Sequence, residues 1–203
     1  MPARFPGLAS ESGQWAKDVS CSSDCIPDPA LCLIFIGMPG SGKSTLALAL
    51  ARRLGWACLD TDHLMEAWYG LPLEDLRQTL GREQFLLAEE KTLLSIDVKR
   101  CIIATGGSAV YSSKAMQALK GSGLIIYLQA DYPTIRQRIH QHPDRGLVMQ
   151  PGQSLHDIYE ERLTLYERYA DLTLSTASAS VQSCIQTLEK SLYDLWSKEK
   201  QTS

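Results

Sequence analysis

The chain of 203 residues contains no asparagine, has nearly balanced charge and lacks a long hydrophobic run. Without asparagine it cannot carry the N-K-x-D signature by which GTPases select guanine. Twenty basic against 23 acidic residues give a net charge of −3, which provides no basic surface for nucleic acid. The apolar run at residues 31–36 is far shorter than the roughly 20 residues that cross a bilayer. The sequence therefore predicts neither nucleic-acid binding nor a membrane span.

The cysteines indicate neither a metal site nor disulfides. The chain has six, none of them in a C-x-x-C pair, and Cys21 and Cys25 stand four positions apart with no accompanying histidine pattern. The first residues lack the basic and apolar stretches of a secretory leader, and Glu11 and Asp18 argue against a transit peptide. The sequence thus predicts a cytoplasmic protein with reduced thiols.

Hydrophobic patterning divides the chain at about residue 30. Residues 1–30 are rich in Ser, Pro, Gly and Asp and show no periodicity, which predicts a disordered tail. Over residues 31–203, short apolar runs alternate with amphipathic stretches, a pattern typical of one three-layer α/β domain with a parallel sheet. The expected strands lie at 31–36, 56–59, 101–104, 124–128 and 172–174, and the expected helices at 43–54, 82–98, 113–120, 132–141, 155–169 and 181–198. The polar break at 142–154 is long enough to serve as a lid.

The most specific motif is Gly37-Met-Pro-Gly-Ser-Gly-Lys-Ser44, a complete G-x-x-x-x-G-K-[ST]. It follows an expected strand and opens an expected helix, which is the context that this phosphate-binding loop requires. Its glycines let backbone N–H groups converge on phosphate oxygens, and the helix N-terminus adds a favourable partial charge. Lys43 is expected to reach the β- and γ-phosphates, and the Ser44 hydroxyl to bind Mg²⁺. The sequence therefore predicts binding of a nucleoside triphosphate.

Two aspartates, Asp60 and Asp62, follow the second expected strand. The strand at 124–128 runs into glutamine, so the carboxylate of a Walker B motif must come from elsewhere. Because ligands bind at the carboxyl ends of strands in open α/β sheets, Asp60 can lie near Mg²⁺ while Asp62 faces an acceptor hydroxyl. Alternatively, either aspartate only caps the following helix. A third strand end, Ala104-Thr-Gly-Gly-Ser108, exposes backbone N–H groups at adjacent glycines, as an ordinary turn also does.

In this order, the motifs resemble those of the shikimate kinase family of small-molecule P-loop kinases. The resemblance covers about residues 33–176 and runs through G-M-P-G-S-G-K-S-T, L-D-T-D, G-R-E-Q-F-L-L-A-E-E, A-T-G-G-S and I-I-Y-L to R-G-L-V and R-L-T-L-Y. It implies a five-stranded parallel sheet in the order 2-3-1-4-5. It also implies phosphoryl transfer from ATP to a ring hydroxyl, that of shikimate in aromatic amino acid biosynthesis.

The resemblance further implies roles for residues at matching positions. ATP binding is implied for the phosphate loop, an arginine beside adenine and an arginine in the lid: Gly40, Ser41, Gly42, Lys43, Ser44, Thr45, Arg138 and Arg145. Catalysis is implied for Lys43 and for Asp62 as the base, and Mg²⁺ binding for Ser44 and Asp60. The implied substrate site comprises Asp62, Glu89, Gly106, Gly107 and Arg162. Within it, Arg162 pairs with the substrate carboxylate.

Three departures from the family pattern bear on what the site binds. The family's Phe-Arg is Phe85-Leu86 here, so one of two arginines for the substrate carboxylate is missing. A charged hydrogen bond is typically worth about 1.5–3 kcal/mol, and Arg82, one helical turn earlier, is a candidate substitute. The third glycine of the strand end is Ser108, and the lid motif R-P-L-L is R-G-L-V, both mild changes.

The missing arginine leaves three functions open. The acceptor is shikimate, or it carries an ammonium beside its carboxylate, as homoserine does, because one cation fewer suits such a substrate. The third alternative is a nucleotide-binding regulatory module without catalysis. Against it, Lys43, Asp60 and Asp62 are intact, and a module without catalysis has no chemical reason to keep both aspartates. The sequence predicts a monomeric kinase, with the amphipathic segment 181–196 packed on the sheet.

Overall fold

The computed structural model describes residues 31–141, 147–150, 152–177 and 179–202, with the backbone alone from residue 196 onward. Its strands form a five-stranded sheet in the order β2-β3-β1-β4-β5, and every neighbouring pair is parallel. The strands are β1 (Cys32–Ile36), β2 (Ala57–Asp60), β3 (Cys101–Ala104), β4 (Gly123–Gln129) and β5 (Leu172–Ser175). Each begins and ends within one residue of its predicted range. The predicted fold class and strand order are confirmed.

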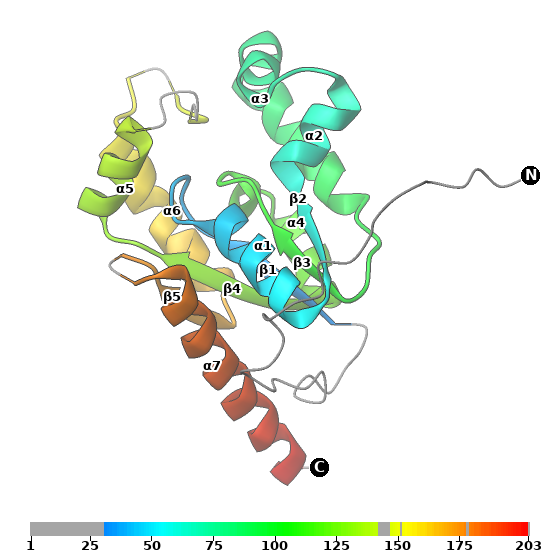
Figure 1. The fold of residues 1–203 in the computed structure, drawn as a ribbon. Coiled ribbons are helices and arrows are strands. Elements are labelled where there is room, and N and C mark those ends of the chain that lie inside the picture. The colour runs from blue at the N-terminus through cyan, green and yellow to red at the C-terminus, as the bar shows by residue number, and fades with distance from the viewer. Residues whose placement is uncertain (1–30, 142–146, 151, 178, 203) are drawn as a thin grey trace, which may run out of the picture.

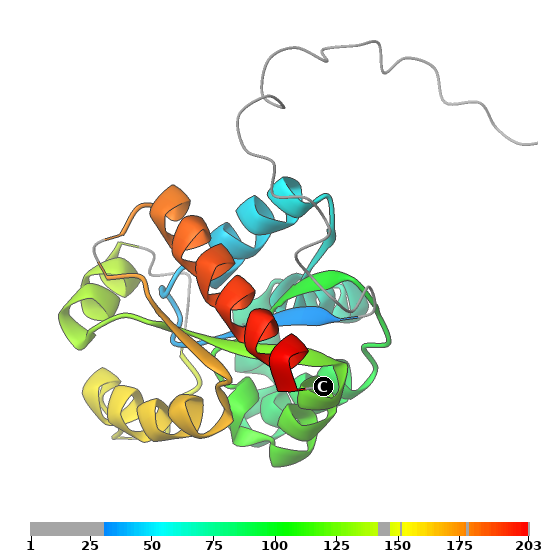
Figure 2. The same ribbon diagram turned by 90° about the horizontal axis from the view of Figure 1, so that it is seen from below.

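Helices cover both faces of the sheet (Figures 1 and 2). They are α1 (Lys43–Leu54), α2 (Thr61–Tyr69), α3 (Leu73–Leu94), the 3₁₀ turn η2 (Ala109–Tyr111), α4 (Ser113–Ser122), α5 (Tyr132–His140), α6 (Leu155–Tyr169) and α7 (Val181–Thr202). In Figure 2, α1 and α7 lie on one side of the sheet and α4 and α6 on the other.

The central strand β1 shows why its sequence is apolar at every position. Successive side chains of a strand point to opposite faces. Leu33 and Phe35 pack in the cluster that contains residues of α1 and α7, whereas Ile34 and Ile36 pack in the cluster that contains residues of α4 and α6. All five residues of the strand are fully buried. The phosphate loop therefore follows a strand that is buried on both faces.

Burial on both faces holds only for the inner strands. The edge strands β2 and β5 are partly exposed, because each has a neighbour on one side only among the described residues. Cys58 on β2 is accordingly exposed, whereas Cys32 on β1 and Cys101 on β3 are buried. All the described cysteines are free thiols, and no cluster of metal-ligating side chains is found among the described residues.

The region 61–80 was not predicted as helical, yet it forms α2 and the first part of α3. The predicted helix at 82–98 corresponds to the second part of α3, which ends at Leu94. The two parts meet at Gly81, whose φ of 68° and ψ of 174° break the helical path. Figure 1 shows α2 and the first part of α3 standing away from the sheet. They pack in a small separate core that includes Met65, Phe85 and Val148.

Several sequence predictions concern parts of the chain that the structure describes only in part or not at all. The predicted tail at 1–30, with Cys21 and Cys25, lies outside the described residues, and the predicted lid at 142–154 is described only at 147–150 and 152–154. The final helix does pack on the sheet as predicted, through Cys184, Ile185, Leu188 and Leu192. No described helix combines the length and the apolar character needed to cross a lipid bilayer.

Candidate active site

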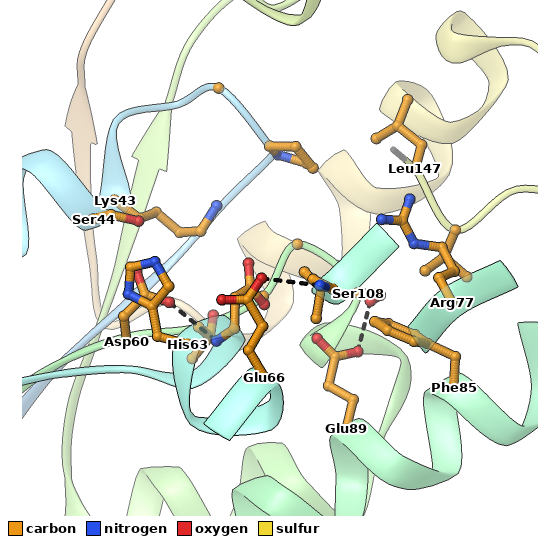
Figure 3. Close-up of a pocket in the computed structure, with 18 of the residues that line it drawn as sticks. Lys43, Ser44, Asp60, His63, Glu66, Arg77, Phe85, Glu89, Ser108 and Leu147 are labelled. Atoms are coloured by element: carbon orange, nitrogen blue, oxygen red, sulfur yellow. Dashed lines mark hydrogen bonds between the residues drawn. The ribbon is translucent and has the colours of Figure 1, made fainter. Parts of the chain in front are cut away.

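Most of the predicted site residues line one pocket at the carboxyl ends of β1, β2 and β3 (Figure 3). The parallel sheet brings these ends together, although they lie far apart in sequence. The predicted residues that line it are Gly40, Gly42, Lys43, Ser44, Thr45, Asp60, Asp62, Glu89, Gly106, Gly107 and Arg162. Ser41 and Arg138 line an adjacent hollow that shares Gly40, Gly42 and Thr45. Arg145 lies outside the described residues.

The phosphate loop joins the end of β1 to the first residue of α1. Gly37 has a φ of 145°, and a Cβ there would approach the carbonyl oxygen of Leu128 to 2.6 Å, so this turn requires glycine. The side chain of Lys43 is largely buried, and its Nζ donates hydrogen bonds to the carbonyl oxygens of Gly37 (2.8 Å) and Met38 (3.0 Å). The ammonium is thereby held inside the loop. Oxygens of a bound phosphate would accept hydrogen bonds from the same ammonium.

Asp60 and Asp62 have different local roles. Asp60 is the N-cap of α2, and its Oδ1 accepts a hydrogen bond from the backbone N–H of Asp62 (3.0 Å). The capping alternative therefore applies to Asp60, whose carboxylate also lines the pocket. Burial, followed by the negative charge of Asp60, raises the pKa of Asp62 to about 6, although Lys43 and other cations lower it. Asp62 is thus ionised near neutral pH and close to the range suited to a general base.

Glu89, on the second part of α3, reaches the same pocket. Its Oε2 accepts a hydrogen bond from the hydroxyl of Ser108 (2.6 Å), and both residues are buried. Burial raises the pKa of Glu89 to about 7, while the hydrogen bond from Ser108 opposes the shift. A Cβ at Gly106 would come within 2.2 Å of Glu89 and 2.7 Å of Asp62, so any larger residue would displace both carboxylates. The adjacent glycines are therefore part of the pocket, and more than an ordinary turn.

Arg162 on α6 is almost completely buried at the pocket. Its Nε donates to the hydroxyl of Tyr111 (3.2 Å), one terminal nitrogen donates to the carbonyl oxygen of Val148 (3.2 Å), and the guanidinium lies 5.1 Å from the Tyr111 ring centre. Among the described residues, Arg162 has no carboxylate within 4.0 Å. A buried cation without such a partner suits an anionic ligand.

The adjacent hollow lies on the α1 side of the phosphate loop and includes Arg138, Thr176 and Cys184. Arg138 donates hydrogen bonds to the carbonyl oxygens of Gly40 (3.0 Å) and Thr176 (2.9 Å). The hydroxyl of Thr176 in turn donates to the carbonyl oxygen of Ser41 (2.9 Å). These contacts connect the phosphate loop to α5 and to the segment after β5, and they form a surface continuous with the phosphate site.

Sequence reasoning missed several residues that line the main pocket. They include Pro39, His63, Glu66, Arg77, Phe85, Leu147 and Val148. Arg77 belongs to the unpredicted first part of α3 and to no motif, so no local pattern marked it. Leu86 does not line this pocket but faces the hollow between α3 and η2, together with Leu87, Leu93 and Tyr111. Arg82 lies over the ring of Tyr111 at 5.8 Å and does not line the main pocket.

Comparisons with known proteins agree with this geometry. A family model described as shikimate kinase matches residues 39–192. The chain is 32% identical over 182 residues to the shikimate kinase of Bordetella pertussis, covering 85% of each chain. It is 32% identical over 163 residues to that of Neisseria gonorrhoeae, covering 79% of this chain and 95% of the relative.

Solved structures lead to the same family. The shikimate kinase from Acinetobacter baumannii in complex with shikimate superimposes with a TM-score of 0.73 at 27% identity, covering 88% of this chain and 99% of the other. The shikimate kinase from Bacteroides thetaiotaomicron shares the fold, with a TM-score of 0.68 at 21% identity. On the match over residues 39–192 and the identity to curated relatives, the chain belongs to the shikimate kinase family.

Proposed function

We propose that this chain transfers the γ-phosphoryl group of ATP to a hydroxyl group of shikimate. The observation that supports it best is one pocket that holds Lys43 of the phosphate loop, the carboxylate of Asp62 and the buried guanidinium of Arg162. Each suits one part of the reactants: the phosphates, the attacking hydroxyl and the acceptor carboxylate. The relatives that share this family are named for the same activity, and one of the matching structures is described as a complex with shikimate.

The residues near Lys43 fit a magnesium ion. Magnesium is usually held by one or two side-chain oxygens together with phosphate oxygens and water. The Ser44 hydroxyl and the Asp60 carboxylate supply such oxygens beside Lys43 (Figure 3). The capping bond of Asp60 uses Oδ1, and no described hydrogen bond engages its Oδ2. When bound, Mg²⁺ would neutralise charge on the β- and γ-phosphates.

The residues of the chain divide the remaining work. Lys43, now bonded to two carbonyl oxygens of its own loop, would exchange those acceptors for phosphate oxygens when the triphosphate binds. Asp62 accepts the proton of the attacking hydroxyl, because its pKa of about 6 leaves it ionised at neutral pH. Arg162 fixes the acceptor through its carboxylate, and the backbone at Gly106 and Gly107 allows a close approach. Because phosphoryl transfer depends mainly on positioning and charge, these contacts account for most of the chemistry.

The experiment that tests the proposal offers the purified protein Mg-ATP with shikimate or with homoserine and measures ADP release. We expect turnover with shikimate and none above background with homoserine. Turnover with homoserine and none with shikimate would show that the acceptor is a hydroxy amino acid and would contradict the proposal. ATP binding without turnover of either compound would support a non-catalytic module, which family membership and the shared pocket of Lys43, Asp62 and Arg162 do not favour.

A further inference from the structure

This chain has leucine in place of the family's arginine at position 86, and the structure shows where that side chain lies. Leu86 faces the hollow between α3 and η2 and does not line the main pocket. Arg82, the substitute suggested by the sequence, stacks on Tyr111 and does not line the pocket either. Neither position therefore places a second cation beside Arg162 in the main pocket.

Among the described residues, Arg77 is the other arginine that lines the pocket of Arg162 and Asp62. Its side chain is only 11% exposed, and its guanidinium lies 5.7 Å from the centre of the Phe85 ring. Figure 3 shows Arg77, Phe85 and Leu147 on the side of the pocket opposite to Lys43, Ser44 and Asp60. An acceptor between these sides would therefore turn its hydroxyl toward the phosphate loop and its opposite end toward Arg77.

The charges around Arg77 agree with an anionic ligand. Burial lowers the pKa of Arg77, the negative charges of Glu74 and Asp62 oppose this shift, and the positive charge of Arg162 lowers the pKa by a smaller amount. The carboxylate that Arg77 contacts is that of Glu74, one turn earlier on α3, at 2.7 Å. Glu74 is 36% exposed and does not line the pocket. Two cations that line one partly buried pocket favour a ligand that brings a carboxylate into it.

The backbone explains why an arginine at 77 reaches the site. Gly81 interrupts the helix with a positive φ, so the first part of α3 takes a different direction from the second part. The first part of α3 contacts the small core through the buried side chain of Leu76. Arg77, the next residue, is thereby held at the edge of the pocket. Arg77 thus reaches the pocket from a different part of α3 than position 86 would.

We propose that Arg77 binds the acceptor carboxylate together with Arg162 and replaces the arginine that this chain lacks at position 86. This inference rests on the proposed function, because it assigns a residue to the acceptor site of that reaction. It makes Arg77 a specificity determinant: the pair selects an acceptor with a carboxylate and no neighbouring ammonium, which two cations would repel.

The test compares shikimate with its methyl ester, which keeps the hydroxyl groups and lacks the negative charge. In the wild type we expect kcat/KM to favour shikimate over the ester. Arg77→Met should reduce this preference by about ten- to a hundredfold, the value of one charged hydrogen bond, and leave the KM for ATP unchanged. Arg77→Lys, which keeps the charge and loses the planar fork, should have an intermediate effect.

Two matched controls separate binding from structure. Arg82→Met removes an arginine of the same helix that lies outside the pocket, and it should leave the preference unchanged. Glu74→Gln removes the ion-pair partner of Arg77 and keeps the cation, so the preference should persist. Melting temperatures report whether each variant folds, and Arg77→Lys carries the test if Arg77→Met does not fold.

The outcomes that overturn the inference are distinct from those that overturn the proposed function. An unchanged preference in folded Arg77→Met and Arg77→Lys, an equal loss with shikimate and ester, or the same loss in Glu74→Gln would each remove Arg77 from the carboxylate site. A loss in Arg82→Met alone would assign the second cation to Arg82. Absence of shikimate turnover in the wild type would overturn the proposed function itself, before any variant is compared.

Discussion

The two sides of the active site are built differently. The phosphate side consists of a glycine loop between β1 and α1, at the fully buried centre of the sheet, and it presents mainly backbone groups. The acceptor side depends on side chains from α2, α3 and α6, and part of it rests on a small core away from the sheet. A site formed by backbone groups depends on one loop conformation and so on its sequence motif. In a site formed by side chains, a residue at another position can supply the same functional group. Leu86 and Arg77 are consistent with such an exchange on the acceptor side.

The largest loss of activity is expected from a change at Asp62, where the two sides of the active site meet. Asp62→Asn keeps the size of the side chain and removes its ability to accept the hydroxyl proton. We expect kcat to fall by about 10²–10⁴-fold while the KM for ATP stays within a few-fold of the wild type. Steady-state kinetics with both substrates varied would measure this. Retained activity would show that Asp62 is not the base.

A change confined to the phosphate side is expected to have a slightly smaller effect. Lys43→Ala removes a positioned cation and should reduce kcat by about 10²–10³-fold, because the stabilisation of charge on the transferred group is lost. The acceptor affinity, measured by equilibrium binding of shikimate, should change little. Activity within threefold of the wild type, or an equal loss of acceptor affinity, would contradict a division into two sides.

Stability and activity should respond to pH in opposite directions. The pKa of Asp62 is raised to about 6 and that of Glu89 to about 7, so the folded protein holds more protons than the unfolded chain between about pH 4 and 7. The free energy of unfolding should therefore fall across this interval as pH rises, by an amount on the order of a few kcal/mol. Turnover should rise through pH 6 as Asp62 ionises.

Glu89→Gln provides the control for the pH prediction. This variant removes one titrating group from the site, so denaturant unfolding at several pH values should show a shallower dependence on pH than in the wild type. The same slope in both proteins would mean that the native pKa of Glu89 is not raised. Turnover should still rise with pH in this variant, because Asp62 keeps its carboxyl group.

The smallest effect is expected from restoring the family residue. Leu86→Arg in the wild type should change the KM for shikimate by only a few-fold, because Arg77 already supplies a second cation. In the Arg77→Met background, the same substitution should recover up to about tenfold in KM. The double-mutant cycle therefore predicts strong coupling between positions 77 and 86. Equal effects of Leu86→Arg in both backgrounds would show that the positions act independently.

Local sequence patterns predicted most of the sheet and the phosphate side. Strands such as β1 and β3 are marked by continuous apolar runs, and the loop that starts at Gly37 requires its glycines for reasons of backbone geometry. The same patterns did not predict α2 or the first part of α3, where short amphipathic segments pack on a small core and not on the sheet. The burial of β2 and β5 was also not predictable locally, because edge position is a property of the assembled sheet.

The sequence by itself determined the phosphate loop, the positions of the strands along the chain and the pair of aspartates at the end of β2, because each depends on residues close together in the chain. The order of the strands within the sheet followed only from the resemblance to a family. Only the tertiary structure showed that Arg77 lines the same pocket as Arg162, the cation that the family resemblance had already assigned to the acceptor. Arg77 and Arg162 lie 85 positions apart in the numbering of the chain and share a pocket because Gly81 redirects α3 and α6 packs beside η2. A contact between side chains so distant in sequence leaves no local pattern, since it depends on the packing of the elements that carry them.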